Sequence, residues 1–182
     1  MANRYAALLA AVNVGKRKVP MAQLREVLGG LGYTGVQTYL ASGNAVFDTE
    51  EAQDGSAARI AAALEEKFGF AVPTLVRDAA YLQAVIEACP FPAAGVEGRQ
   101  LHAVFHSVQV DENRFADLDA AAFLPEEFRI GDRVMYLHLP GGMGRSALAA
   151  ALGKPAGRLR GVVATGRNWN TVKALAELTG AG

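Results

Sequence analysis

The sequence predicts an α+β fold made of two halves, each with the element order β-α-β-β-α-β. Short apolar runs alternate with segments whose apolar residues recur at helical spacing. This order is read twice, on either side of a stretch rich in Pro and Gly at 90–98. The chain has 182 residues, of which 51% are hydrophobic, and this is ample for a core. The order predicts two ferredoxin-like subdomains with antiparallel sheets: 1–89 with a connecting helix, and 90–182 with a closing helix.

The first half opens on a short apolar run and turns into a helix near Pro20, a residue that suits a first helical turn. Glycines near residue 30 end that helix. Ser42-Gly43-Asn44 is a turn cluster between two alternating runs, which predicts a hairpin. The predicted strands cover 5–13, 36–40, 45–47 and 74–76, and the predicted helices begin at Pro20, Ser56 and Asp78.

The second half repeats this order, with a hairpin turning at Gly131-Asp132. Its predicted strands cover 101–108, 128–130, 134–139 and 159–165, and its predicted helices cover 112–122, 146–152 and 169–178. No identity between individual residues of the two halves is read, so a duplication is inferred from element order alone.

The formal net charge of zero is a cancellation. Residues 1–47 carry a net charge of +4, residues 48–144 a net charge of −9, and residues 145–182 a net charge of +5. Such asymmetry fits an anion-binding face, and it also fits two basic ends that pair with an acidic middle. No apolar run reaches the roughly 20 residues that span a bilayer. We therefore expect a soluble, cytoplasmic protein without a membrane partner. Cys89 is the single cysteine, which suits a packed thiol.

The predicted topology brings loops together in two clusters. In each half, the loop after the first strand meets the hairpin turn at one end of the sheet, and the loop after the third strand meets the end of the fourth strand at the other. The first-half cluster contains Asn13, Lys16, Arg17, Lys18, Ser42, Gly43 and Asn44. The second-half cluster joins residues 141–146 to residues 165–171. Lys16, Arg17 and Lys18 fit either a phosphate-binding loop or ordinary hydrated surface charge, and the glycine-rich segment 141–146 fits either a ligand-binding loop or a simple turn of the chain.

The second-half cluster is the stronger candidate for a binding site. Residues 145–176 hold six cations and no carboxylate. Arg145 and Ser146 follow a glycine-rich loop before a helix, where anions are favoured. Arg167-Asn168-Trp169-Asn170 holds the single tryptophan at a strand-to-helix turn, where Asn168 can cap the helix while Arg167 and Asn170 bind a ligand. Trp169 can be either a stacking platform or a core anchor.

Other chemistry is not readable from the sequence. His102 and His106 share a face of a strand, but four residues at about 3.3 Å each place them about 13 Å apart, too far to share a metal ion. Adding His138 gives no ligand set, so neither a metal nor a cofactor is predicted. Asp48, Glu50, Glu51 and Asp54 have the pattern of a solvated polar loop. No catalytic residues can be named, and whether the protein is an enzyme stays open.

Several motifs resemble a bacterial family called domain of unknown function 1697. They occur in the family's order along the chain: residues 5–9, Asn13-Val14-Gly15, residues 19–25, Thr38-Tyr39, residues 42–47, residues 144–146 and residues 167–172. The resemblance implies an α+β fold of two ferredoxin-like subdomains. It implies no activity, because the family is uncharacterised. One departure concerns the end of the first strand, where the family usually has Arg-Gly-Ile-Asn and this chain has Ala10-Ala11-Val12-Asn13.

The hypothesis that follows is a protein that binds an anionic ligand, either a phosphate-bearing small molecule or single-stranded nucleic acid. Its site residues are Arg145, Ser146, Arg167, Asn168, Trp169 and Asn170, with Asn13, Ser42 and Asn44 from the first half. Two alternatives stay open: an enzyme acting on a phosphorylated metabolite, and a structural or assembly protein in which Trp169 anchors the fold. The oligomeric state is not readable.

Overall fold

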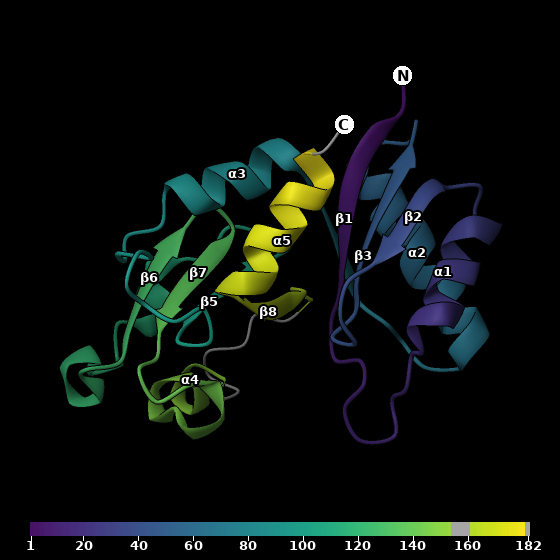
Figure 1. The fold of residues 1–182 in the computed structure, drawn as a ribbon. Helices are drawn as coiled ribbons and strands as arrows, with labels where there is room; N and C mark the ends of the chain where they lie inside the picture. The colour runs from purple at the N-terminus through teal and green to yellow at the C-terminus, as the bar shows by residue number, and fades with distance from the viewer. Residues whose placement is uncertain (154–160, 181–182) are drawn as a thin grey trace. The chain divides into compact units, whose positions relative to one another are not determined.

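The protein is an α+β structure with two four-stranded antiparallel sheets and helices (Figure 1). The computed structural model describes residues 1–153 and 161–180. The chain divides into two compact units. Unit 1 comprises Met1–Ala84 together with the C-terminal residues from Ala174 on, and unit 2 comprises Val85–Lys173. Within the described residues, no helix is both long enough and apolar enough to cross a membrane.

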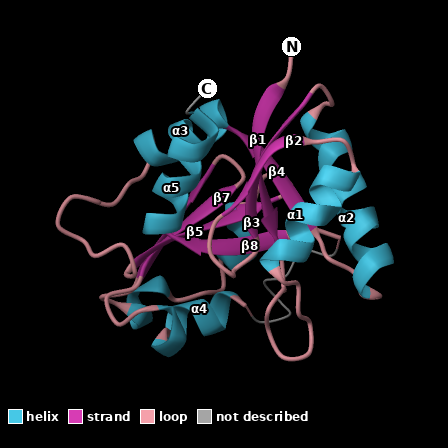
Figure 2. Cartoon of the chain, turned by 45° about the vertical axis from the view of Figure 1, so that its right-hand side comes forward, coloured by secondary structure: helices cyan, strands magenta, loops and turns pink. Residues whose placement is uncertain are grey.

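Unit 1 is built on a sheet with the strand order β2-β3-β1-β4. The strands are β1 (Asn3–Leu9), β2 (Thr34–Thr38), β3 (Asn44–Thr49) and β4 (Thr74–Asp78). Two helices, α1 (Met21–Gly30) and α2 (Gln53–Phe68), lie side by side on one face (Figure 2). The core between sheet and helices contains Tyr33 stacked on Phe47, with ring centroids 4.7 Å apart.

Two helices are shared by the units. The helix α3 (Ala79–Glu87) follows β4, and α5 (Trp169–Gly180) closes the described chain. The last turns of α5 belong to unit 1, where Arg4 Nε donates a hydrogen bond of 2.7 Å to the carbonyl oxygen of Leu178. This bond fixes the end of α5 to the start of β1.

Unit 2 has the strand order β6-β7-β5-β8. Its strands are β5 (Leu101–His106), β6 (Glu127–Gly131), β7 (Val134–His138) and β8 (Ala164–Asn168). One face packs against α4 (Ala147–Leu152) and the β5–β6 connection, forming a core with Leu137, Leu139 and Leu148 at its centre. The predicted strand at 159–165 begins in residues 154–160, which lie outside the described part, and the observed strand continues to Asn168.

The predicted helix at 112–122 is wrong. Two short 3₁₀ helices stand there instead, η1 (Glu112–Phe115) and η2 (Ala120–Phe123). Asp111 caps η1 by accepting a hydrogen bond of 2.9 Å from the Asn113 backbone amide. Only Phe115, Leu118 and Phe123 of this segment pack on the core of unit 2. Three contacts in nine residues do not form a continuous apolar stripe, so no long helix is stabilised by burial.

The two sheets share one register, which the element order alone did not reveal. Ala6 of β1 pairs with Arg77 of β4 and with Val46 of β3, whereas Ala103 of β5 pairs with Arg167 of β8 and with Tyr136 of β7. Residue numbers therefore rise by 97 from β1 to β5, and by 90 from β3 to β7 and from β4 to β8. At this register, a buried arginine, Arg77 or Arg167, is the last residue but one of the fourth strand in both units.

The residue after each arginine performs the same task. Asp78 Oδ1 accepts a hydrogen bond of 2.7 Å from the Tyr81 amide, and Asn168 Oδ1 accepts one of 3.0 Å from the Thr171 amide. Each side chain thereby caps the first turn of the helix that follows. The strand-to-helix turn is thus built alike in the two units, with Arg-Asp in one and Arg-Asn in the other.

Two buried histidines should make the fold sensitive to acid. Burial lowers the pKa of His102 and of His106 below the ordinary value of 6.5, because it disfavours the charged ring. The unfolded chain then binds protons more readily than the native one, so stability is full above about pH 6.5 and falls as the pH drops below it. We expect His102→Gln with His106→Asn to flatten the dependence of the unfolding free energy on pH between 6.5 and 5. If the unfolding free energy, measured by urea titration at each pH, depends on pH in the double variant as steeply as in the wild type, the prediction is wrong.

Candidate functional site

Three chain segments meet at one end of the unit 1 sheet, here called the basic end: residues 10–20, 39–43 and 69–73. Backbone hydrogen bonds join them, with Leu9 N donating to Gly43 O at 2.9 Å and Ala10 N donating to Pro73 O at 2.8 Å. Figure 1 shows the purple loop between β1 and α1 extending past the ends of the strands. The first two segments are those that the predicted topology brings together.

The Asn13 side chain connects the first two segments. Its Oδ1 accepts a hydrogen bond of 2.9 Å from Val19 N, and its Nδ2 donates to Val19 O at 3.2 Å and to Ala41 O. The loop also closes on itself through an isolated bridge between Val14 and Arg17. Asn13 therefore positions the loop by using its own amide group, which is engaged within the fold.

Backbone conformation is unusual at this end. Among the described residues, four that are not glycine have a positive φ, and three of them lie here: Ala11 at 56°, Asn13 at 56° and Leu40 at 57°. For alanine and leucine this region is costly, whereas asparagine tolerates it. Strained residues of this kind persist where the surrounding structure determines them, and they cluster at functional sites.

Gly43 explains how closely the two loops approach. Its φ is 90°, and a Cβ there would lie 2.7 Å from Val12 Cγ2 and 2.9 Å from Leu9 Cβ. A side chain is therefore excluded on both steric and conformational grounds. Next to it, the buried Asn44 donates from Nδ2 to Tyr39 O and to Ser42 Oγ, both at 2.8 Å. Asn44 fixes the hairpin turn, and Ser42 is exposed at its tip.

The charge at this end has one sign. Residues 5–25, 27–47 and 67–77 contain no Asp or Glu. Lys16, Lys18 and Arg25 are exposed, and Arg17 lies half-buried with its guanidinium carbon 5.0 Å from the centroid of the Phe70 ring. Arg25 also donates a hydrogen bond of 2.6 Å to Thr38 Oγ1. Glu26, the exposed neighbour of Arg25, pairs with Lys67 at 3.5 Å. Lys16, Arg17 and Lys18 have no carboxylate in their own segment, and they give a positive local potential.

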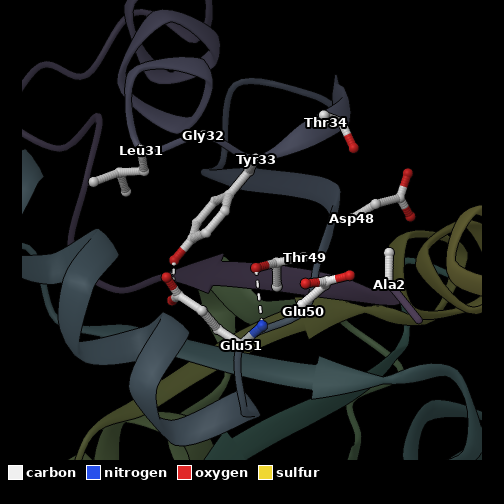
Figure 3. A pocket seen from close by; sticks show the side chains of 9 residues that line it. All are labelled: Ala2, Leu31, Gly32, Tyr33, Thr34, Asp48, Thr49, Glu50 and Glu51. Carbon is white, nitrogen blue, oxygen red and sulfur yellow. Dashed lines mark hydrogen bonds between the residues drawn. The ribbon is translucent and has the colours of Figure 1, made fainter.

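The opposite end of the same sheet is acidic. It has a hollow of about 570 Å³ lined by Tyr33, Asp48, Glu50, Glu51 and neighbouring residues (Figure 3). Two of these carboxylates are already engaged: Asp48 pairs with Arg4 at 3.0 Å, and Glu51 accepts a hydrogen bond of 2.9 Å from the Tyr33 hydroxyl and pairs with Arg59. The described part of the chain has no group of acidic, histidine or cysteine side chains that could hold a metal ion. Unit 1 is thus electrically polarised along its strands.

The residues of the second-half cluster are largely engaged in the fold. Ser146 caps α4 by accepting a hydrogen bond of 2.8 Å from Ala149 N, and its hydroxyl donates to Glu126 Oε2 at 3.1 Å. Glu126 also accepts a bond of 2.8 Å from Leu148 N. Arg145 is exposed at the end of η3 (Met143–Arg145). A carboxylate thus occupies the helix start at which the sequence predicted an anion.

Arg167 is buried on the unit 2 sheet. Its Nη1 donates to Thr165 Oγ1 at 2.7 Å and to Gly166 O at 2.9 Å. Burial lowers the pKa of the guanidinium to about 10, so the group keeps its charge at neutral pH. Lys154, Arg158 and Arg160, which share the basic segment with Arg167, lie outside the described residues.

The turn after Arg167 packs tightly. Asn168 caps α5, as the sequence predicted. Trp169 is 3% exposed, donates from its backbone amide to Gly98 O, and packs on Tyr136 with ring centroids 6.3 Å apart. Of the two roles open for Trp169, the structure shows the core anchor. Asn170 is exposed, yet its amide covers Gly98, where a Cβ would lie 2.1 Å from Asn170 Oδ1.

Sequence reasoning missed the apolar part of the basic end. Val14 and Leu40 are each 57% exposed, although both are large aliphatic residues. They lie next to Asn13 and Ala41, the two residues joined across the loops. No propensity of Val or Leu predicts exposure, and a positive φ at Leu40 contradicts the local preference of leucine. Only the assembled loops reveal the pair.

The comparisons with known proteins agree on fold and family. A conserved bacterial protein from Streptococcus pneumoniae of known structure is similar over 98% of this chain and 99% of its own, with a TM-score of 0.76 and 21% identity. At that identity the likeness concerns the fold alone. No curated protein sequence matches. Residues 2–136 match the model of a protein family of unknown function, DUF1697. Because this match spans well over half of the chain, the protein belongs to the DUF1697 family.

Proposed function

We propose that the protein binds an anionic, phosphate-bearing ligand at the basic end of unit 1. The observation that carries the proposal is the single sign of charge where three segments meet: Lys16, Arg17 and Lys18 with no carboxylate in those segments. Lysine and arginine bind phosphate by charge-assisted hydrogen bonds. The exposed hydroxyl of Ser42 adds a neutral donor beside them.

The geometry supports this end over the second-half cluster. In that cluster, Ser146 caps α4, Asn168 caps α5 and Trp169 is a core residue. The carboxylate of Glu126 also occupies the start of α4. Asn13 and Asn44 are engaged too, but Asn13 positions a loop in which Lys16 and Lys18 are exposed, and Asn44 fixes the adjacent hairpin turn. In this proposal they act as positioning residues, and Lys16, Lys18 and Ser42 contact the ligand.

We further propose that each unit is a ferredoxin-like subdomain and that the two arose by duplication. Strand orders β2-β3-β1-β4 and β6-β7-β5-β8, the shared register and the common Arg-Asp or Arg-Asn turn support this. Charge separates the copies. In unit 2, the β5–β6 connection and the β6–β7 turn carry six acidic residues against Arg114 and Arg133: Asp111, Glu112, Asp117, Asp119, Glu126 and Asp132. Within the described residues, only unit 1 has such a basic end, and Lys154, Arg158 and Arg160 of unit 2 lie outside that part of the chain.

Backbone amide NMR during a titration with inorganic pyrophosphate tests the location. We expect shifts in residues 13–18 and 39–44, without shifts in residues 141–146 and 165–171. Shifts confined to the latter two stretches would move the site to the second-half cluster. A titration that moves neither set would contradict anion binding at either place.

Charge removal gives a second test. The double variant Lys16→Ala with Lys18→Ala is expected to weaken pyrophosphate binding by roughly tenfold to a hundredfold. This corresponds to a joint contribution of about 1.5 to 3 kcal/mol from the two exposed lysines, the range for one hydrogen bond to a charged group. Lys173→Ala is the matched control, since Lys173 is exposed in unit 2. Isothermal titration at low salt measures both. Equal losses in the control and the double variant would show that net charge, not this end, determines binding.

A further inference from the structure

We infer that the anionic partner of the basic end is the surface of a lipid bilayer that carries acidic phospholipids. This inference rests on the proposed function and names the ligand. Two features of the same loops support it together: exposed cations and exposed large aliphatic side chains. Neither feature alone would decide the class of partner.

The aliphatic pair is the first support. Val14 and Leu40 are two of the six large hydrophobic residues that are exposed among the described residues, and both lie on loops that Asn13 joins. A single exposed aliphatic residue is ordinary, whereas exposed apolar residues that are grouped at one place indicate an interaction surface. An aliphatic side chain that enters the boundary between headgroups and acyl chains is removed from water, which favours binding.

Backbone strain at Leu40 strengthens the point. Leucine at a φ of 57° is disfavoured relative to asparagine or glycine, and the side chain it presents to solvent contributes little to the core. A stability criterion alone would select a polar residue that tolerates this conformation. Leu40 is therefore placed at this turn at a cost in stability, which fits a role in binding rather than in folding.

The cations supply the second part. Lys16, Arg17 and Lys18 follow Val14 after one glycine, so charge and apolar surface lie within five residues of one loop, with Lys16 and Lys18 exposed. Each basic residue near an anionic membrane contributes about 1 kcal/mol, and the attraction is screened within a Debye length. The cations would contact the anionic headgroups of the bilayer, and the aliphatic side chains would contact its acyl chains.

Competing ligands fit less well. Small metabolites are held in concave sites that bury most of their surface, whereas this loop extends past the strand ends (Figure 1). Single-stranded nucleic acid is bound by aromatic rings that stack on bases. At the basic end Phe70 is already covered by Arg17, and Tyr39 is only half-exposed. The sequence expectation of no membrane partner rested on the lack of a spanning segment, which a loop tip does not need.

Vesicle flotation with the full chain tests the inference. We expect binding to vesicles of phosphatidylcholine with 30–40% phosphatidylglycerol (roughly the acidic fraction at which such surfaces attract basic segments), and none to pure phosphatidylcholine. The variants Val14→Ser and Leu40→Asn should each reduce the partition coefficient roughly tenfold, the effect of withdrawing one buried aliphatic side chain. Leu124→Asn is the matched control, because Leu124 is 63% exposed in unit 2.

Folding does not confound this test, because the melting temperature of Leu40→Asn should equal or exceed that of the wild type. Vesicle binding that both variants retain would overturn the inference in favour of purely electrostatic adsorption. Binding to single-stranded RNA without binding to vesicles would also overturn it and assign the basic end to nucleic acid. If pyrophosphate binds but vesicles do not, this inference fails alone. If neither binds, the proposed function fails with it.

Discussion

Asn13→Ala is expected to lower the free energy of unfolding by about 2 to 4 kcal/mol and to abolish anion binding at the basic end. The variant loses three hydrogen bonds, to Val19 N, Val19 O and Ala41 O, at about 0.5 to 1.5 kcal/mol each. It also places alanine at a φ of 56°, where asparagine is better tolerated. Urea unfolding with pyrophosphate titration measures both effects.

Asn13→Gly separates the two causes. Glycine adopts the positive φ without a steric penalty, so this variant reports the hydrogen bonds with little contribution from the backbone. We expect it to lose slightly less stability than Asn13→Ala and to lose anion binding equally. If Asn13→Gly binds pyrophosphate like the wild type, the side chain does not position Lys16 and Lys18, and the role given to Asn13 is wrong.

Trp169→Ala should have the largest effect on stability, lowering the free energy of unfolding by about 3 to 5 kcal/mol, as is typical when a buried aromatic ring is removed. The ring is 3% exposed and packs on Tyr136. Pyrophosphate binding under native conditions should be unchanged, because Trp169 contributes nothing to the basic end. Thermal and urea unfolding, followed by circular dichroism, give the stability.

Trp169→Phe is the control for packing and should cost less than the alanine variant, because most of the ring volume is kept. Since Trp169 is the single tryptophan, wild-type emission reports on this position alone. Pyrophosphate should leave that emission unchanged. A ligand-induced change that Arg167→Ala removes without loss of stability would restore the second-half cluster as the binding site.

Element type was readable wherever the apolar pattern was strong. In unit 1 every predicted strand and helix exists, because β1 is a continuous apolar run that is buried and α2 has a repeating apolar face that packs on the core. The pattern failed at 112–122, where acidic and alanine residues satisfy helix propensity but only Phe115 and Leu118 pack on the core. The helix propensity of this segment did not decide its structure, because the segment has no continuous apolar face that could be buried.

Some properties of the candidate site could likewise be predicted from the sequence, and others could not. The sequence by itself determined the family, the alternation of strands and helices, the cap at Asn168, and the cations that follow Asn13, because each depends on residue identity and local spacing. Only the tertiary structure decided which of these side chains are available. Burial removed Trp169 from solvent and left Leu40 exposed at a positive φ, and both outcomes depend on segments that are distant in sequence. Exposure is a property of the assembled packing, and no single segment encodes it.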